Sequence, residues 1–274
     1  MSSDRLLRLL LPVLLLLLPR CSVKENRSAC PCTLTIELAG LPVRPVVLDV
    51  VGEGYSHTEV VHADTVLVLS VPKGELTVSA VGGVFAEEGV EAGSTAFLRG
   101  DGSVHIPPGE EAPPLYLFHA EVSTFASEQV VLPVVLHKQF CALELLFTGP
   151  PGYGPPFEVL VEGPVSGWLA SGEPLSLSYE LGAIAPFSRR LLPGSDGRAT
   201  LRLPRQGDDS LLMHIVFSDR IVRTFALGSY IVAAGYDWTA PDLEDLTLRV
   251  DIALTSVTFS TDLWSQSEDL EIWI

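Results

Sequence analysis

Basic residues are scarce in this sequence, and their scarcity excludes several classes of partner. Lys and Arg number 17 against 34 Asp and Glu, which gives a formal net charge of −17 at pH 7. A surface of this sign repels phosphate groups, so we expect neither nucleic acid nor anionic lipid headgroups as partners. Charged residues make up only 19% of the chain and hydrophobic ones 47%, which excludes a disordered protein and predicts a well-buried core.

Long hydrophobic runs are missing beyond the first 20 residues. No later segment reaches about 18 uninterrupted apolar residues, so no transmembrane helix is expected. The N-terminus carries Arg5 and Arg8 ahead of an apolar stretch at residues 9–18, which only Pro12 interrupts. This stretch is too short to span a bilayer and is typical of a secretory signal peptide, which we predict at residues 1–20.

The motifs of catalysis and metal binding are missing as well. None of the 6 histidines pairs at helical i, i+4 spacing or forms His-x-His, and a single Cys-x-Cys falls short of a zinc pattern. The sequence has no Gly-x-Ser-x-Gly elbow, no phosphate-binding loop and no Gly-x-Gly-x-x-Gly. Glu110 and Glu111 are adjacent in a turn, where their side chains diverge. We therefore expect a protein that is not an enzyme and that has no metal, no cofactor and no small-molecule substrate.

Cys21 directly follows the predicted signal peptide, at the position where bacterial lipoproteins carry their lipid. We interpret Cys21 as the attachment point of a diacylglycerol and residues 21–32 as a short polar tether. Arg20 departs from the small residue that a lipoprotein signal peptidase usually requires before the cysteine. The alternative is an ordinary signal peptide that is cut nearby and leaves Cys21 as a thiol. Export by either route places the mature chain where disulfides are allowed.

The remaining cysteines are Cys30, Cys32 and Cys141. A bond between Cys30 and Cys32 would close a strained ring, so we expect a disulfide between Cys141 and either of the two. The third thiol then stays free or pairs outside the chain.

Alternating hydrophobicity predicts an all-β protein. Residues 33–38 place Leu34, Ile36 and Leu38 on one face, and similar short runs recur along the chain between Gly- and Pro-rich turns. Residues 192–204 predict a hairpin that turns near Asp196-Gly197, and residues 225–235 are the best candidate for a short helix. Many short strands of this spacing are typical of β-sandwiches.

There are too many strands for one small sandwich, so we expect two in tandem. We place the N-terminal domain at residues 33–132 and the C-terminal domain at residues 133–274. Pro133 lies between apolar strand-like runs and marks the expected crossover. A second possible break is the proline-rich segment 149–157, which cannot form a central strand.

The C-terminus ends on an alternating strand with Leu270, Ile272 and Ile274 on one face. Such a strand pairs within its own domain, which we favour, or adds to the sheet of another subunit.

Two further features have simple explanations. The tripeptide Arg99-Gly100-Asp101 matches an integrin-binding motif, but three residues coincide easily by chance and Asp101 already begins a turn. Tryptophans can stack on sugars, but packing in a sandwich core is their more common role. The chain has four of them, Trp168, Trp238, Trp264 and Trp273.

Four segments together resemble the FimB-type fimbrial anchor subunits, or minor fimbrillins, of Bacteroidota. They are CSVKENRSACPC (21–32), YLFHAEV (116–122), LHKQFCALEL (136–145) and GYDWTAPDLEDLTLRVDI (235–252). Their order extends the resemblance over nearly the whole mature chain, and the first and last segments are the most specific.

The resemblance implies an outer-membrane lipoprotein that attaches a fimbrial shaft to the cell and limits its length. It implies two β-sandwiches of transthyretin-like topology, a covalent diacylglycerol and acyl lipid on Cys21, and a shaft subunit as partner. It also implies that the strand at 33–38 is retained in the first domain. The candidate strand-exchange residues are Thr33, Leu34, Ile36, Leu38, Leu270, Ile272 and Ile274. Alternatives are a minor shaft or tip subunit of the same fimbria and a carbohydrate-binding surface lipoprotein.

Overall fold

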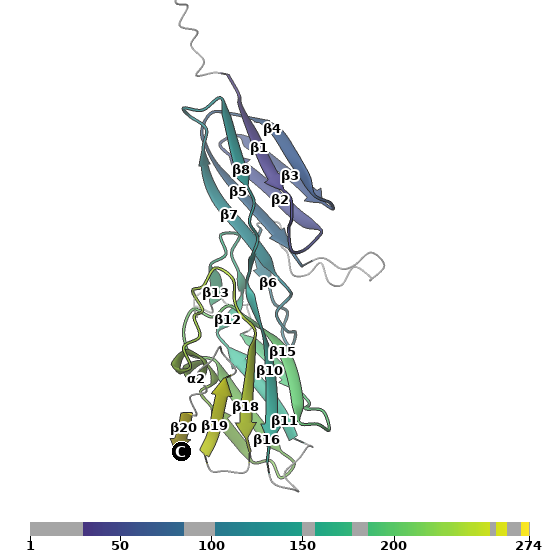
Figure 1. Ribbon diagram of the computed structural model, residues 1–274, viewed down its shortest axis with the longest axis vertical. Coiled ribbons are helices and arrows are strands. Elements are labelled where there is room, and N and C mark those ends of the chain that lie inside the picture. Colours follow the sequence, from purple (N-terminus) through teal and green to yellow (C-terminus); the bar gives the residue numbers. More distant parts are fainter. Residues whose placement is uncertain are drawn as a thin grey trace, which may run out of the picture.

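The computed structural model describes residues 30–84, 102–149, 157–176, 186–252, 256–261 and 270–273. Two β-sandwiches follow one another along the long axis of the molecule, with a small sheet between them (Figure 1). The predicted all-β class with two tandem β-sandwiches is therefore confirmed. The predicted signal peptide, Cys21, Arg99-Gly100-Asp101 and Ile274 lie outside the described residues.

The first sandwich packs a three-stranded sheet against a five-stranded one. The strand order is β4-β1-β8 in the smaller sheet and β3-β2-β5-β7-β9 in the larger. The strands are β1 (Cys32–Leu38), β2 (Val46–Gly52), β3 (Tyr55–Val61), β4 (Thr65–Val71), β5 (Glu75–Gly82), β7 (Tyr116–Ser123), β8 (Gln129–Pro133) and β9 (His137–Lys138).

The second sandwich has sheets of five and four strands, in the orders β15-β10-β18-β19-β20 and β14-β11-β16-β17. Its elements are β10 (Phe140–Thr148), β11 (Phe157–Gly163), β14 (Phe187–Leu191), β15 (Arg198–Pro204), β16 (Leu212–Phe217), β17 (Val222–Phe225), α2 (Leu227–Ala233), β18 (Leu246–Asp251), β19 (Ser256–Thr261) and β20 (Leu270–Trp273). The helix predicted at 225–235 is confirmed by α2. No helix among the described residues is long and apolar enough to cross a membrane.

Period-two sequences form these strands because alternate side chains enter the space between the sheets. In β1, Leu34, Ile36 and Leu38 are fully buried, while Thr33 and Glu37 on the other face are exposed. The same alternation runs through β10 and β11 in the second sandwich. The apolar face predicted at 33–38 is therefore a core face.

The two sandwiches repeat one pairing scheme. β1 lies antiparallel to β4 and parallel to β8, and β10 lies antiparallel to β15 and parallel to β18. The second sheets correspond in the same way, with β2 between β3 and β5, and β11 between β14 and β16. The second sandwich then extends its larger sheet beyond β18 with β19 and β20. No repeat of this length is visible in the sequence.

The hairpin predicted at 192–204 is wrong. The turn is present, with Gly197 in the left-handed region at φ 75° and its N–H bonded to the Gly194 carbonyl. The flanking strands do not pair, however: β14 belongs to the sheet of β11 and β15 to the sheet of β10. The turn therefore carries the chain from one sheet of the sandwich to the other, where β14 and β15 form the edge strands of the two sheets.

The chain crosses between the two sandwiches more than once. β6 (Val104–His105), from the first half of the sequence, pairs with β12 (Val165–Trp168), which also pairs with β13 (Pro174–Ser176). Val104, Ile106 and Leu115 are buried in the core of the second sandwich. Beyond Pro133, β9 still pairs with β7 of the first sandwich, and the chain enters the second sandwich at β10. The small sheet between the two sandwiches, formed by β6, β12 and β13, thus contains strands from both halves of the sequence (Figure 1).

Candidate functional site

β1 contains the first candidate strand-exchange residues, and it is a central strand. Thr33, Leu34, Ile36 and Leu38 face Ser70 to Thr65 of β4 on one side. The first three face Gln129 to Leu132 of β8 on the other. Both edges of the β1 backbone are thereby occupied. In this arrangement β1 completes its own sandwich and offers no edge to another chain.

β20 contains Leu270 and Ile272 of the second set, and it is the outermost strand of its sheet. Leu270 pairs with Phe259 and Ile272 with Val257, so β20 lies antiparallel to β19. The C-terminal strand is therefore paired within its own sandwich, and the far edge of its backbone forms the end of the five-stranded sheet.

β4 offers an edge that sequence reasoning missed. Among the described strands it pairs only with β1. Val66 and Val68 point outward with 54% and 64% of their surface exposed. Leu67 and Leu69 point toward the core but are only partly buried, because none of the described strands lies beyond β4 in this sheet. The apolar alternation of residues 66–71 marked a strand but did not indicate its place at the sheet edge.

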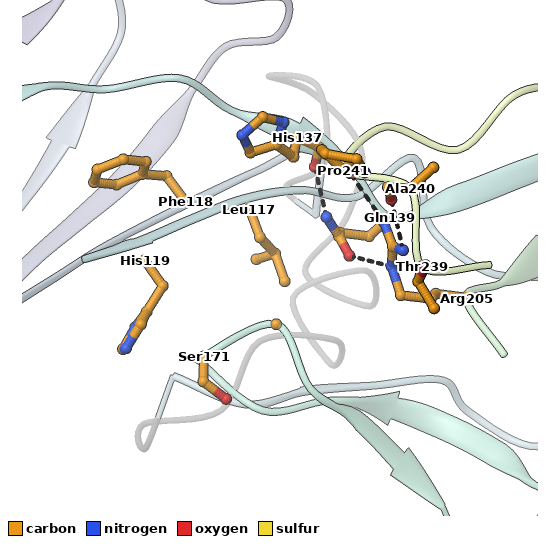
Figure 2. A pocket seen from close by; sticks show the side chains of 11 residues that line it. Leu117, Phe118, His119, His137, Gln139, Ser171, Arg205, Thr239, Ala240 and Pro241 are labelled. Carbon is orange, nitrogen blue, oxygen red and sulfur yellow. Dashed lines mark hydrogen bonds between the residues drawn. The ribbon is translucent and has the colours of Figure 1, made fainter. Parts of the chain in front are cut away.

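The two sandwiches meet at a contact that we call the joint, which is formed by residues 137–142, Arg205 and the 236–245 loop. Arg205 forms hydrogen bonds with both of the other parts (Figure 2). Its Nε donates to Oε1 of Gln139 and its Nη1 to the Ala240 carbonyl, both at 2.8 Å. Nη1 also donates to the carbonyl of Trp238. Nη2 donates to the Pro241 carbonyl at 2.9 Å. Burial lowers the pKa of Arg205, although the nearby acidic groups oppose this shift. The guanidinium thus ties the segment that leaves the first sandwich to the 236–245 loop of the second.

Asp242 and Asp245 of the same loop also accept hydrogen bonds from the segment that leaves the first sandwich. Asp242 accepts the backbone N–H of Lys138 at 2.7 Å and contacts Nδ1 of His137 at 3.2 Å. Asp245 accepts the Lys138 ammonium at 2.5 Å and the Ala142 backbone N–H at 2.8 Å. Burial opposes the ionisation of Asp242, but these hydrogen bonds lower its pKa overall. The loop is therefore held by ionic and main-chain contacts at once.

Three of the segments that carry the family resemblance meet at this joint. The 116–122 segment supplies Tyr116, whose ring packs edge-on against Phe140 of the 136–145 segment with centroids 5.9 Å apart. The 235–252 segment supplies the loop that wraps Arg205. These sequence signatures therefore encode the connection between the two domains.

An open cavity of about 370 Å³ lies beside the joint, lined in part by Leu117, His119, His137, Gln139 and Arg205 (Figure 2). Arg205 is committed to carbonyl and amide acceptors, and His137 to Asp242. The described residues contain no group of three or more His, Cys, Asp or Glu placed to hold a metal ion. The chemistry of the joint is that of a structural connection.

The cysteines lie in three different environments. Cys32 is buried in the first core and Cys141 in the second, while Cys30 is exposed. All three are free thiols, so the disulfide expected between Cys141 and Cys30 or Cys32 does not occur in this structure. Burial raises the pKa of the Cys141 thiol to about 12, with the neighbouring Tyr236 hydroxyl opposing this shift.

Two of the tryptophans pack in the core. Trp168 is fully buried and Trp238 nearly so, within the core of the second sandwich. Both are therefore core residues. The side chains of Trp264 and Trp273 lie outside the described residues.

Comparison with solved structures shows which proteins share this fold. No family model matches the sequence, and no curated protein matches it either. Solved structures of fimbrial and adhesin proteins of Bacteroidales match over most of the chain.

Three of these structures are similar in fold at low identity. The fimbrial anchor protein Mfa2 of Porphyromonas gingivalis has a TM-score of 0.58 at 13% identity, over 87% of this chain and 100% of that one. A protein of Bacteroides ovatus assigned as an adhesin has a TM-score of 0.59 at 14% identity, over 92% and 97%. A protein of Bacteroides thetaiotaomicron assigned to polysaccharide binding has 0.58 at 10%, over 88% and 98%. These similarities establish a shared fold, consistent with the resemblance to FimB-type subunits.

Proposed function

We propose that this protein is a fimbrial anchor subunit of the outer membrane. It attaches a fimbrial shaft to the cell and limits the length of the shaft. The observation that carries the proposal is the place of β1. The N-terminal strand of an anchor is retained, and here β1 is paired on both sides within its own sandwich. The fold shared with the anchor protein Mfa2 supports the same function.

In this proposal, lipid on Cys21 holds the protein at the membrane. Each methylene buried in the bilayer contributes roughly 0.8 kcal/mol, so two or three acyl chains give durable attachment. Residues 21–32 then act as a tether between the bilayer and β1. A retained β1 leaves its own groove filled, so the fimbria grows from the anchor in one direction only.

The first shaft subunit binds by strand addition, and β4 is the edge we propose for it. An added strand would bond to the open side of the β4 backbone and cover the half-buried Leu67 and Leu69. Main-chain bonds along a full strand release slowly, as a structure under shear requires.

The β4 edge can be tested without disturbing the core. Val66 and Val68 point outward, and lysine at an edge strand opposes pairing with another strand. We expect the double variant Val66→Lys/Val68→Lys to fold normally but no longer to bind the shaft subunits of the fimbriated parent strain. Val51→Lys is the matched control, because Val51 is 49% exposed but lies on β2, between β3 and β5. Equal capture by both variants would exclude β4 as the docking edge.

The anchor role itself is tested in cells. A Cys21→Ser variant is expected to leave the membrane fraction and to release long fimbriae into the medium. Intact-mass measurement of the native protein checks the chemistry directly, because an anchor starts at Cys21 with added acyl mass. A mature chain that starts after Arg27 or Arg44 would instead identify a processed shaft or tip subunit.

A further inference from the structure

One end of the first sandwich carries an exposed aromatic residue. β1 begins at this end, which lies opposite to the second sandwich (Figure 1). The β4–β5 and β7–β8 turns meet here, and the Thr33 N–H donates to the Glu128 carbonyl at 2.9 Å. Phe125 lies in the β7–β8 turn with 65% of its surface exposed.

The exposure of Phe125 is built into the turn. The preceding residue, Thr124, is fully buried, and its hydroxyl donates to the Pro72 carbonyl at 2.8 Å and accepts the Gly74 N–H at 2.9 Å. The Thr124 N–H also donates to the Gly74 carbonyl at 2.8 Å. The Lys73 ammonium donates to the Ser127 carbonyl from the neighbouring turn. These bonds lock the two turns together and leave the ring of Phe125 directed away from the core.

The length of the chain ahead of β1 indicates what covers this ring. Cys21 and Cys30 are nine residues apart in the sequence, and a fully extended chain spans at most about 3.6 Å per residue, or about 32 Å. A lipid on Cys21 therefore keeps this end of the sandwich within that distance of the bilayer surface. Aromatic side chains favour the boundary between headgroups and acyl chains.

Charge favours a shallow and local contact. The chain has a net charge of −17, so the protein is not drawn to the membrane by a broad positive surface. Glu75 and Glu128 are exposed at the same end and oppose deep insertion. A single apolar ring can enter the interface while these carboxylates stay in water.

We propose that Phe125 is a membrane-contact residue and that this end of the first sandwich rests on the lipid interface. The proposal depends on the lipidation of Cys21 proposed above. Lipid and ring together give two points of attachment, which restrict tilting of the long axis and direct the second sandwich away from the membrane. The partner is the bilayer interface itself, recognised by apolar contact.

The native thiols allow a direct test. Cys32 and Cys141 are buried and Cys21 would be acylated, so a maleimide nitroxide should label Cys30 alone. The labelled, lipidated full-length protein is reconstituted in phosphatidylcholine vesicles. Electron paramagnetic resonance then compares collisions of the label with oxygen, which enters lipid, and with a water-soluble nickel chelate. We expect oxygen collisions to dominate in the wild type and this preference to be lost in Phe125→Ser.

Leu192→Ser is the matched control, because Leu192 is also a highly exposed apolar residue but lies in the second sandwich. It should leave the Cys30 label in lipid. An acylated wild type whose label stays in water, or a Phe125→Ser variant with unchanged collisions, would overturn the membrane contact alone. A chain without acyl mass that fails to float with vesicles would overturn the anchor function as well.

Discussion

Replacing Arg205 by methionine is expected to loosen the joint and to destabilise the second sandwich. Methionine keeps most of the apolar stem but leaves the acceptors of Arg205 without a donor. These are the Gln139 side chain and the carbonyls of Trp238, Ala240 and Pro241. Each buried acceptor left unsatisfied costs about 1–3 kcal/mol. Water can reach part of this site, and the variant no longer desolvates a charge, so we expect a net loss of about 3 kcal/mol.

Urea unfolding measures this loss. With a slope near 2 kcal/mol per molar, the midpoint of the second sandwich should fall by about 1.5 M. Arg190→Met is the matched control, because Arg190 is 63% exposed and, among the residues that the structure describes, forms its ion pair with Glu158 at the surface. A surface pair of this kind contributes at most about 1 kcal/mol. Arg205→Lys should recover only part of the loss, since an ammonium lacks the planar fork of the guanidinium. Equal midpoints for Arg205→Met and Arg190→Met would refute the reasoning.

Two further predictions concern the thiols and the pH dependence. Ellman's reagent should react with Cys30 in the folded, unlabelled protein, and with Cys32 and Cys141 only after unfolding. Burial protects Cys32 and Cys141 from the reagent and raises the pKa of Cys141. A disulfide of Cys141 in non-reducing peptide maps would contradict this prediction. The lowered pKa of Asp242 means that its stabilising effect is present above the unfolded value of about 3.9 and is lost as the pH falls through the folded pKa. Asp242→Asn should therefore be less stable than the wild type at pH 7, and this difference should shrink toward pH 3; a difference that does not change with pH would argue against the ionised contact.

Local patterns determined a large part of this architecture. The alternation of Leu34, Ile36 and Leu38 predicted a half-buried strand, and β1 buries all three. The turn at Gly197 and the helix α2 were also predictable, because left-handed glycine turns and short helices depend on residues close in sequence. The number of strands implied two sandwiches, since one core cannot cover so many.

Long-range pairing could not be predicted in the same way. The partners of β14 and β15 lie in different sheets, although only six residues separate the two strands. β6 joins the second sandwich across about 60 residues, and nothing in its sequence indicates a partner at that distance. Strand pairing depends on main-chain bonds that every residue except proline can make, so the sequence of one strand does not specify its neighbour.

The candidate sites also have features that the sequence predicts and features that depend on long-range pairing. By itself the sequence determined the alternating strands, the acidic surface and the segments that carry the family resemblance, because these are properties of neighbouring residues. Only the tertiary structure decided that β1 is central and β4 an edge, that the resemblance segments meet around Arg205, and that Phe125 is exposed beside the start of β1. Each of these depends on which distant segments lie side by side, and that is determined by how the two hydrophobic cores pack.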